Sequence, residues 1–157
     1  MPATYADLYE YARLTVDLSV RHVAEGGVPF AALVVRGDRV LGTGVDRVQE
    51  DRDPTAHAGM VALRRAAAEH GPAALAGSLL VASGEPCPLC YAAAIWCHVD
   101  QVVFAADRHT AASAGFDYTD SYALLTADPE DWPMRATHLP VPGSRRPFDD
   151  WRARTLS

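Results

Sequence analysis

The sequence predicts a single α/β domain, residues 1–157, in which helices cover both faces of a mixed sheet. Short apolar runs alternate along the chain with longer segments whose apolar residues recur every three or four positions. The length of 157 residues suits one domain with a full core, and 49% hydrophobic and 22% charged residues are ordinary for a globular protein. Strands separated by helices are expected to run parallel in such a sheet.

The N-terminal part is expected to form a helix followed by a β-hairpin. Residues 4–24 have helical periodicity, and Gly26-Gly27 ends the helix. The face expected to be buried comprises Tyr5, Leu8, Ala12, Val16, Val20 and Val23. The apolar runs 30–35 and 40–45 flank a turn at 36–39, which predicts two antiparallel strands.

The middle of the chain alternates helices and strands. A polar loop, 46–56, leads into a helix that is expected to start near Pro54 or Thr55 and to end at His70. A strand over 78–83, a helix over 87–98 and a strand over 101–106 follow.

The C-terminal part has weaker patterns. Residues 107–127 are expected to form helical pieces broken around Gly115. The segment 128–157 contains five prolines, and we expect it to pack on the body of the domain or on a dimer partner.

Charge and apolar content narrow the classes of partner. The formal net charge of −6 disfavours a large nucleic-acid interface, which needs a basic face. No apolar run approaches the roughly 18 residues of a membrane span. The N-terminus lacks the pattern of a signal peptide, so a cytoplasmic protein without a membrane partner is expected.

His57, Cys87 and Cys90 have the composition of a metal site. Zinc prefers imidazole and thiolate ligands, and a catalytic site uses three of them and leaves one position open. Each of these residues lies at the predicted start of a helix that follows a strand, so the three are expected to meet at one edge of the sheet. Cys97 is interpreted as a small core residue. A redox pair and a four-ligand structural zinc site are the alternatives.

The blocks Gly27-Val-Pro-Phe-Ala-Ala-Leu-Val-Val, Asp53-Pro-Thr-Ala-His-Ala, Gly84-Glu-Pro-Cys-Pro-Leu-Cys and Ala114-Gly-Phe-Asp resemble the cytidine-deaminase superfamily, and within it the bacterial guanine deaminases. The resemblance implies a three-layer α/β/α fold with a five-stranded mixed sheet. It also implies zinc as cofactor and hydrolytic release of ammonia from a free purine-like base by zinc-bound hydroxide. Relatives of this type form homodimers.

The resemblance also implies roles for individual residues. Phe30, Asp46, Ala58 and Asp117 are expected to bind the base, and Asp117 to handle protons. The zinc motif of nucleobase deaminases is H-x-E…P-C-x-x-C, in which Glu is the general acid/base. This chain has Gly59 at the position of that Glu, and Asp46 where the family usually has Asn.

The loss of the Glu leaves several hypotheses open. Another carboxylate, Asp117 or Asp46, carries protons in a deaminase of reduced or rerouted activity; Glu85 is expected to be structural. Alternatively, the chain is an engineered inactive variant or a zinc-containing protein that only binds a base. A protein like the tRNA adenosine deaminases is the third possibility, which the acidic charge disfavours.

Overall fold

The computed structural model describes residues 2–156. Its internal contacts divide the chain into one unit that ends at Leu125 and a second that begins at Thr126, and the two are described separately. Among the described residues, no helix has both the length and the apolar character needed to cross a membrane.

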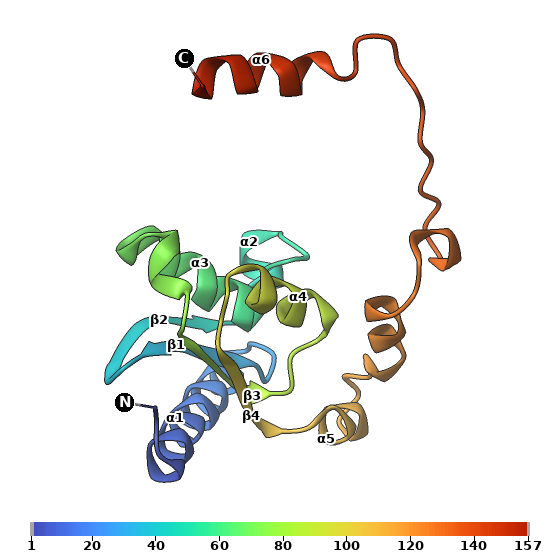
Figure 1. Ribbon diagram of the computed structural model, residues 1–157. Coiled ribbons are helices and arrows are strands. Elements are labelled where there is room, and N and C mark those ends of the chain that lie inside the picture. The colour runs from blue at the N-terminus through green and yellow to red at the C-terminus, as the bar shows by residue number, and fades with distance from the viewer. Residues whose placement is uncertain (1, 157) are drawn as a thin grey trace. The chain divides into compact units, whose positions relative to one another are not determined.

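The first unit is built on a sheet in the order β2-β1-β3-β4 (Figure 1). The strands are β1 (Ala31–Arg36), β2 (Arg39–Val45), β3 (Leu79–Gly84) and β4 (Gln101–Ala106). β1 is antiparallel to β2 and β3, while β3 and β4 are parallel. The predicted hairpin and the parallel pairing of the later strands are therefore confirmed.

The expected fifth strand is not found within residues 2–156, where the sheet has four strands. After β4 the chain enters helix α5 (Arg108–Ser113) instead. The Asp107 side chain accepts a hydrogen bond from Thr110 N at 2.8 Å, which caps this helix and favours a helical start at that point. β4 is consequently an edge strand of the sheet.

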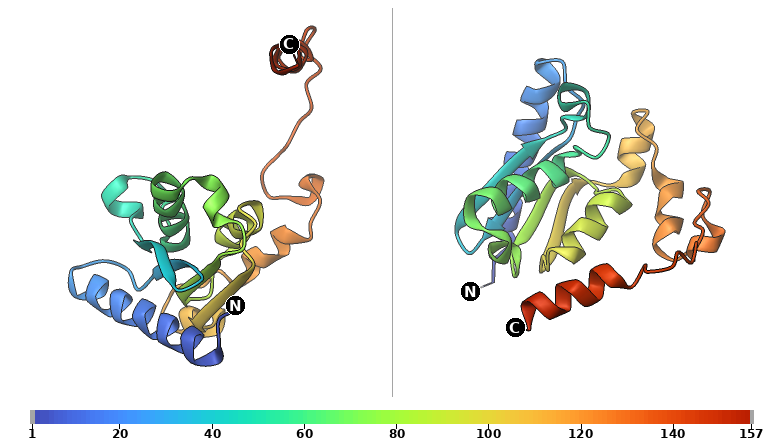
Figure 2. Two further views of the ribbon diagram at one scale, coloured as in Figure 1. Left: turned by 60° about the vertical axis from the view of Figure 1, so that its left-hand side comes forward. Right: turned by 90° about the horizontal axis from the view of Figure 1, so that it is seen from above.

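Helices cover both faces of the sheet, as Figures 1 and 2 show. Helix α1 (Tyr5–Ala24) packs on one face, where Leu33, Val35 and Val81 form the core. Helices α3 (Ala58–His70) and α4 (Pro88–Trp96) cover the other. The larger core cluster on that side includes Val34, Ala62, Leu80 and Ala94. The predicted three-layer α/β/α arrangement is confirmed.

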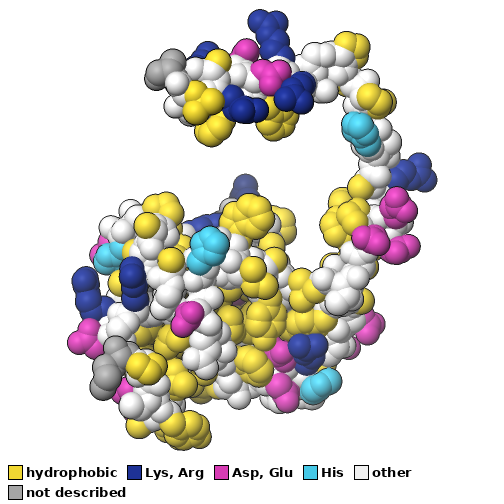
Figure 3. Space-filling model, in the orientation of Figure 1, with side chains coloured by type: hydrophobic (Ala, Val, Ile, Leu, Met, Phe, Trp, Pro, Cys, Tyr) yellow, Lys and Arg dark blue, Asp and Glu magenta, His cyan; other side chains and the backbone are white. Residues whose placement is uncertain are grey.

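Helix α1 is confirmed, but its predicted buried face is only partly right. Leu8 and Ala12 are half-buried, and the other four residues of that face are exposed: Tyr5, Val16, Val20 and Val23. Val20 is 64% exposed, whereas Thr15, Ser19 and His22 are buried. The Thr15 hydroxyl donates to the Ala12 carbonyl at 2.6 Å, so this polar group is satisfied within the helix and can pack on the sheet. Apolar side chains also gather on the outer surface of the first unit in Figure 3.

Shorter helices complete the chain. In the first unit they are α2 (Val48–Asp51), η1 (Pro72–Leu75), α5 and η2 (Thr119–Leu125). α5 and η2 lie on either side of Gly115, as expected. The second unit contains η3 (Pro129–Asp131) and α6 (Arg146–Thr155). The docking of the segment 128–157 on the body or on a partner stays a prediction.

Candidate metal centre and base-binding cavity

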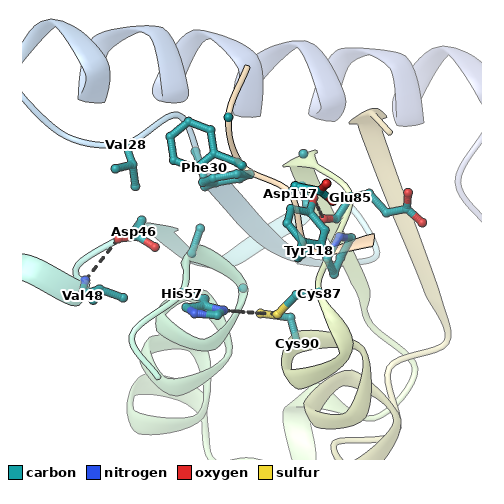
Figure 4. A pocket seen from close by; sticks show the side chains of 18 of the residues that line it. Val28, Phe30, Asp46, Val48, His57, Glu85, Cys87, Cys90, Asp117 and Tyr118 are labelled. Carbon is teal, nitrogen blue, oxygen red and sulfur yellow. Dashed lines mark hydrogen bonds between the residues drawn. The ribbon is translucent and has the colours of Figure 1, made fainter. Parts of the chain in front are cut away.

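His57, Cys87 and Cys90 meet at one edge of the sheet (Figure 4). Their ligand atoms all lie within 4.8 Å of one another. The His57 Nδ1 atom is 3.3 Å from the Cys87 Sγ atom and 3.9 Å from the Cys90 Sγ atom. A donor set of one imidazole and two thiols, gathered this closely, suits a tetrahedral ion with one open position.

Two helix starts position these ligands. His57 is the N-cap of α3, which begins at Ala58 and not at Pro54 or Thr55 as expected. Extended backbone continues to His57, whose φ and ψ angles are −66° and 155°, and this turns its side chain off the helix. Cys87 is the N-cap of α4 and is joined to the end of β3 by Glu85 and Pro86, and Cys90 lies in the first turn of α4.

The environment of the two thiols favours a thiolate. Hydrogen bonds from Cys90 and His57 lower the pKa of Cys87 to about 4. The hydrogen bond to Cys87, together with burial, raises the pKa of Cys90. These shifts favour ionisation of Cys87 before Cys90, and a bound cation would favour release of both protons.

The three ligands lie in a cavity of about 470 Å³. The residues predicted to bind a base, Phe30, Asp46, Ala58 and Asp117, all line it, and so does Gly59. The Phe30 ring packs edge-on against Phe116, with centroids 5.3 Å apart at 89°. A cavity of this size with apolar walls and a few polar groups suits a small heterocycle.

Gly59 lies in the first turn of α3, packed against Cys90. A Cβ atom at this position would lie 3.2 Å from the Cys90 Sγ atom and 3.3 Å from its Cβ atom. These distances are tight, so any side chain at position 59 requires a small shift of Cys90. Gly59 itself supplies no proton-transferring group beside the cluster.

Asp46 and Asp117 lie on opposite sides of the cavity in Figure 4. Asp46 is half-buried, and one of its oxygens accepts a hydrogen bond from Val48 N at 3.2 Å. Asp117 is exposed. Hydrogen bonds from the Thr119 side chain and backbone lower the pKa of Asp117, so its carboxyl group is ionised at neutral pH. The lowered pKa makes Asp117 a weak base, and its ionised carboxyl group has to take up a proton before it can donate one.

Glu85 is the third carboxylate at the cavity, and Arg108 neutralises it. Arg108 donates to Glu85 from its backbone N at 2.8 Å, from Nε at 3.1 Å and from Nη2 at 2.8 Å. The Arg108 guanidinium also lies 3.4 Å above the Tyr122 ring. Tyr118 donates to the Glu85 carbonyl, and Tyr122 to the Pro86 carbonyl. This network holds the loop that carries Cys87, which agrees with the structural role expected for Glu85.

The Glu85→Gln variant is expected to lower the free energy of unfolding by about 1–2 kcal/mol at pH 7, since Glu85 is buried and Arg108 is partly exposed. Hydrogen bonds from Arg108 lower the pKa of Glu85. The stabilisation is thus complete above the unfolded-state pKa of about 4.3 and is lost as pH falls through the lower folded-state pKa. Urea unfolding of both proteins across this range measures the difference.

The matched control for this prediction is Glu10→Gln, which removes an exposed carboxylate paired with Arg13. It is expected to change the free energy of unfolding by less than about 0.5 kcal/mol at any of these pH values. An effect of Glu85→Gln that is equally large at pH 7 and at pH 3 would contradict the assigned ion pair.

Sequence reasoning missed three residues of the site: Arg108, Phe116 and Tyr118. Phe116 and Tyr118 line the cavity on either side of Asp117. Phe116 belongs to the block Ala114-Gly-Phe-Asp, in which only Asp117 was assigned a role, and Tyr118 lies just beyond that block. Arg108 had no signal in the sequence, because its partner Glu85 lies 23 residues earlier and the two meet only when β3 and β4 pair.

Comparisons with known proteins agree with this geometry. Residues 6–106 match the family model of the cytidine and deoxycytidylate deaminase zinc-binding region. The chain is 32% identical to the guanine deaminase of Bacillus subtilis (strain 168), over 90% of this chain and 92% of that protein. The crystal structure of a Bacillus subtilis guanine deaminase superposes with a TM-score of 0.83 at 32% identity, covering 92% of this chain and 93% of that one.

Two further relatives widen the comparison. A tRNA-specific adenosine deaminase of Aquifex aeolicus is 30% identical over 73% of this chain and 77% of that protein. A solved structure in complex with 2,6-diaminopurine has a TM-score of 0.67 and 32% identity, covering 75% of this chain and 66% of that one.

The α/β/α fold and the His-Cys-Cys cluster are those of the hydrolytic deaminases. The chain belongs to the cytidine and deoxycytidylate deaminase family.

Proposed function

We propose that the chain is a zinc-dependent cytoplasmic deaminase of a free purine-like base, guanine or a related aminated heterocycle. The observation that supports this most is the placement of His57, Cys87 and Cys90 inside the cavity walled by Phe30 and Phe116. The likeness to a guanine deaminase over 90% of the chain supports a base as ligand.

The three ligand residues would hold the zinc ion, and a bound zinc ion lowers the pKa of water to near 7 and so supplies the nucleophile. Phe30 and Phe116 form an apolar wall against which the base packs, and Asp46 and Asp117 contact its edges. The reaction also needs protonation of a ring nitrogen and of the departing amine. Gly59 offers no group for these steps, so they fall to Asp117 or Asp46. Either carboxylate would first take up the proton that water loses when it becomes the nucleophile, and we expect the rate to be reduced.

The test is ammonia release from purines, pterins and triazines by the zinc-loaded protein, with products identified by mass spectrometry. We expect slow, zinc-dependent deamination of guanine or a close analogue. Binding without turnover would favour the base-binding alternative. Retention of tRNA in a filter-binding assay, with no effect on free bases, would favour the tRNA adenosine deaminase alternative; the net charge of −6 disfavours it.

We further propose that the protein is a homodimer and that the segment 128–157 packs on the body or on the partner. The exposed aromatic residues Phe148 and Trp151 of α6 support this, because apolar side chains of this size are usually covered. Sedimentation velocity of the full chain is expected to give a dimer, and a monomer at all concentrations would contradict the proposal.

A further inference from the structure

Asp46 is a carboxylate in the wall of the cavity that has no arginine partner there; the basic side chain that it interacts with is His57, one of the metal-ligand residues. Of the described residues that line the cavity, none is Arg or Lys. Glu85 has Arg108 as its partner, and Asp117 is exposed to solvent. Asp46 differs from both, because it is half-buried and is not paired with an arginine. Its charge therefore bears directly on whatever enters the cavity.

A bound zinc ion would not offset this charge. The two thiolates of Cys87 and Cys90 balance the two positive charges of zinc, and His57 binds as neutral imidazole. The centre would be neutral with water in its open position and negative with hydroxide there, so in neither case would it offset the charge of Asp46.

Asp46 is also held in a defined orientation. Its backbone N–H donates to the Phe30 carbonyl at 3.1 Å, and one side-chain oxygen accepts from Val48 N at 3.2 Å. Within residues 2–156 the other oxygen accepts no hydrogen bond. In Figure 4 the Asp46 side chain lies on the cavity wall near His57, with Phe30 above.

An ionised carboxylate only accepts hydrogen bonds. A ligand edge with an N–H group would form a charge-assisted bond to Asp46, whereas a carbonyl or a bare ring nitrogen at that edge would place two acceptors face to face. We propose that Asp46 determines specificity by selecting heterocycles that are uncharged or cationic and present an N–H donor to it. The inference rests on the proposed base-binding function and names the substrate class within it.

The test is binding by isothermal titration to the zinc-loaded full chain and to its Asp46→Asn variant. Three bases are compared. The first is 2,6-diaminopurine. In the second, isoguanine, a carbonyl replaces the 2-amino donor, and in the third, 9-methyl-2,6-diaminopurine, the imidazole N–H is lost. Asn both donates and accepts, so it tolerates either kind of edge. The wild type is expected to prefer 2,6-diaminopurine over at least one of the other two by about tenfold or more. Asp46→Asn is expected to reduce that preference to less than about threefold.

Glu50→Gln is the matched control, because Glu50 is an exposed carboxylate in α2 that does not line the cavity. It is expected to keep the wild-type preference. Equal preferences in the wild type and Asp46→Asn, with both proteins binding zinc and 2,6-diaminopurine, would overturn the role of Asp46 and leave the proposed function standing. Zinc-loaded wild-type protein that binds none of the three ligands would overturn the proposed base-binding function, and the inference with it.

Discussion

Replacement of Gly59 by Glu is expected to raise the rate of base deamination by a factor of about 10²–10⁴, the range that a positioned general acid/base contributes. Gly59 lies in the first turn of α3 and lines the cavity that holds His57 and Cys90. A carboxylate at this position would lie beside the metal ligands and could both protonate the ring and assist departure of the amine. Steady-state ammonia release from the best base of the screen measures the effect.

The Gly59→Ala variant is the control that separates proton transfer from packing. It adds the same Cβ atom, 3.2 Å from the Cys90 Sγ atom, and therefore imposes the same shift of Cys90 without a carboxylate. We expect Gly59→Ala to have wild-type activity or less. If the Gly59→Glu and Gly59→Ala variants deaminate the base at equal rates, with zinc bound to both, the missing carboxylate at position 59 does not limit the rate.

Loss of a metal ligand is expected to have the second large effect. His57→Ala and Cys87→Ser each leave two of the three ligands, and we expect the zinc content to fall from about one per chain to below about 0.2. Because metal binding contributes to folding free energy, the thermal unfolding temperature should fall as well. Elemental analysis of the purified proteins, together with calorimetry, gives both readouts.

Cys97→Ser is the matched control for these variants. Cys97 is a free, half-buried cysteine at the end of α4 that packs against the core and is not part of the cluster. This variant is expected to retain zinc at the wild-type level. Loss of zinc in Cys97→Ser would indicate a fourth protein ligand and hence a structural site.

The features that follow from local sequence patterns were predicted well. Alternating apolar runs predicted the positions of all four strands within one residue at either end. The C-x-x-C spacing and His57 predicted a cluster of metal ligands. The fold brings these residues together because His57 and Cys87 lie at the starts of two helices at the same edge of the sheet. The block around Asp117 predicted one side of the cavity.

Other features depend on tertiary contacts and were not predictable. Periodicity alone favoured Val20 for the buried side of α1, but Thr15 packs there, and its hydroxyl group bonds within the helix. The tight packing of Gly59 on Cys90 and the pairing of Glu85 with Arg108 join segments far apart in sequence. The fifth strand was expected from family likeness, and the local cap at Asp107 favours a helix after β4.

The zinc content of the wild-type protein tests the central claim most directly, because the proposed chemistry depends on the centre formed by His57, Cys87 and Cys90. Protein expressed with adequate zinc and purified without chelators is expected to contain about one zinc ion per chain. That ion should be removable by a chelator and restored by added zinc. Protein that contains no zinc after such a preparation, and takes up none when it is added, would contradict the account.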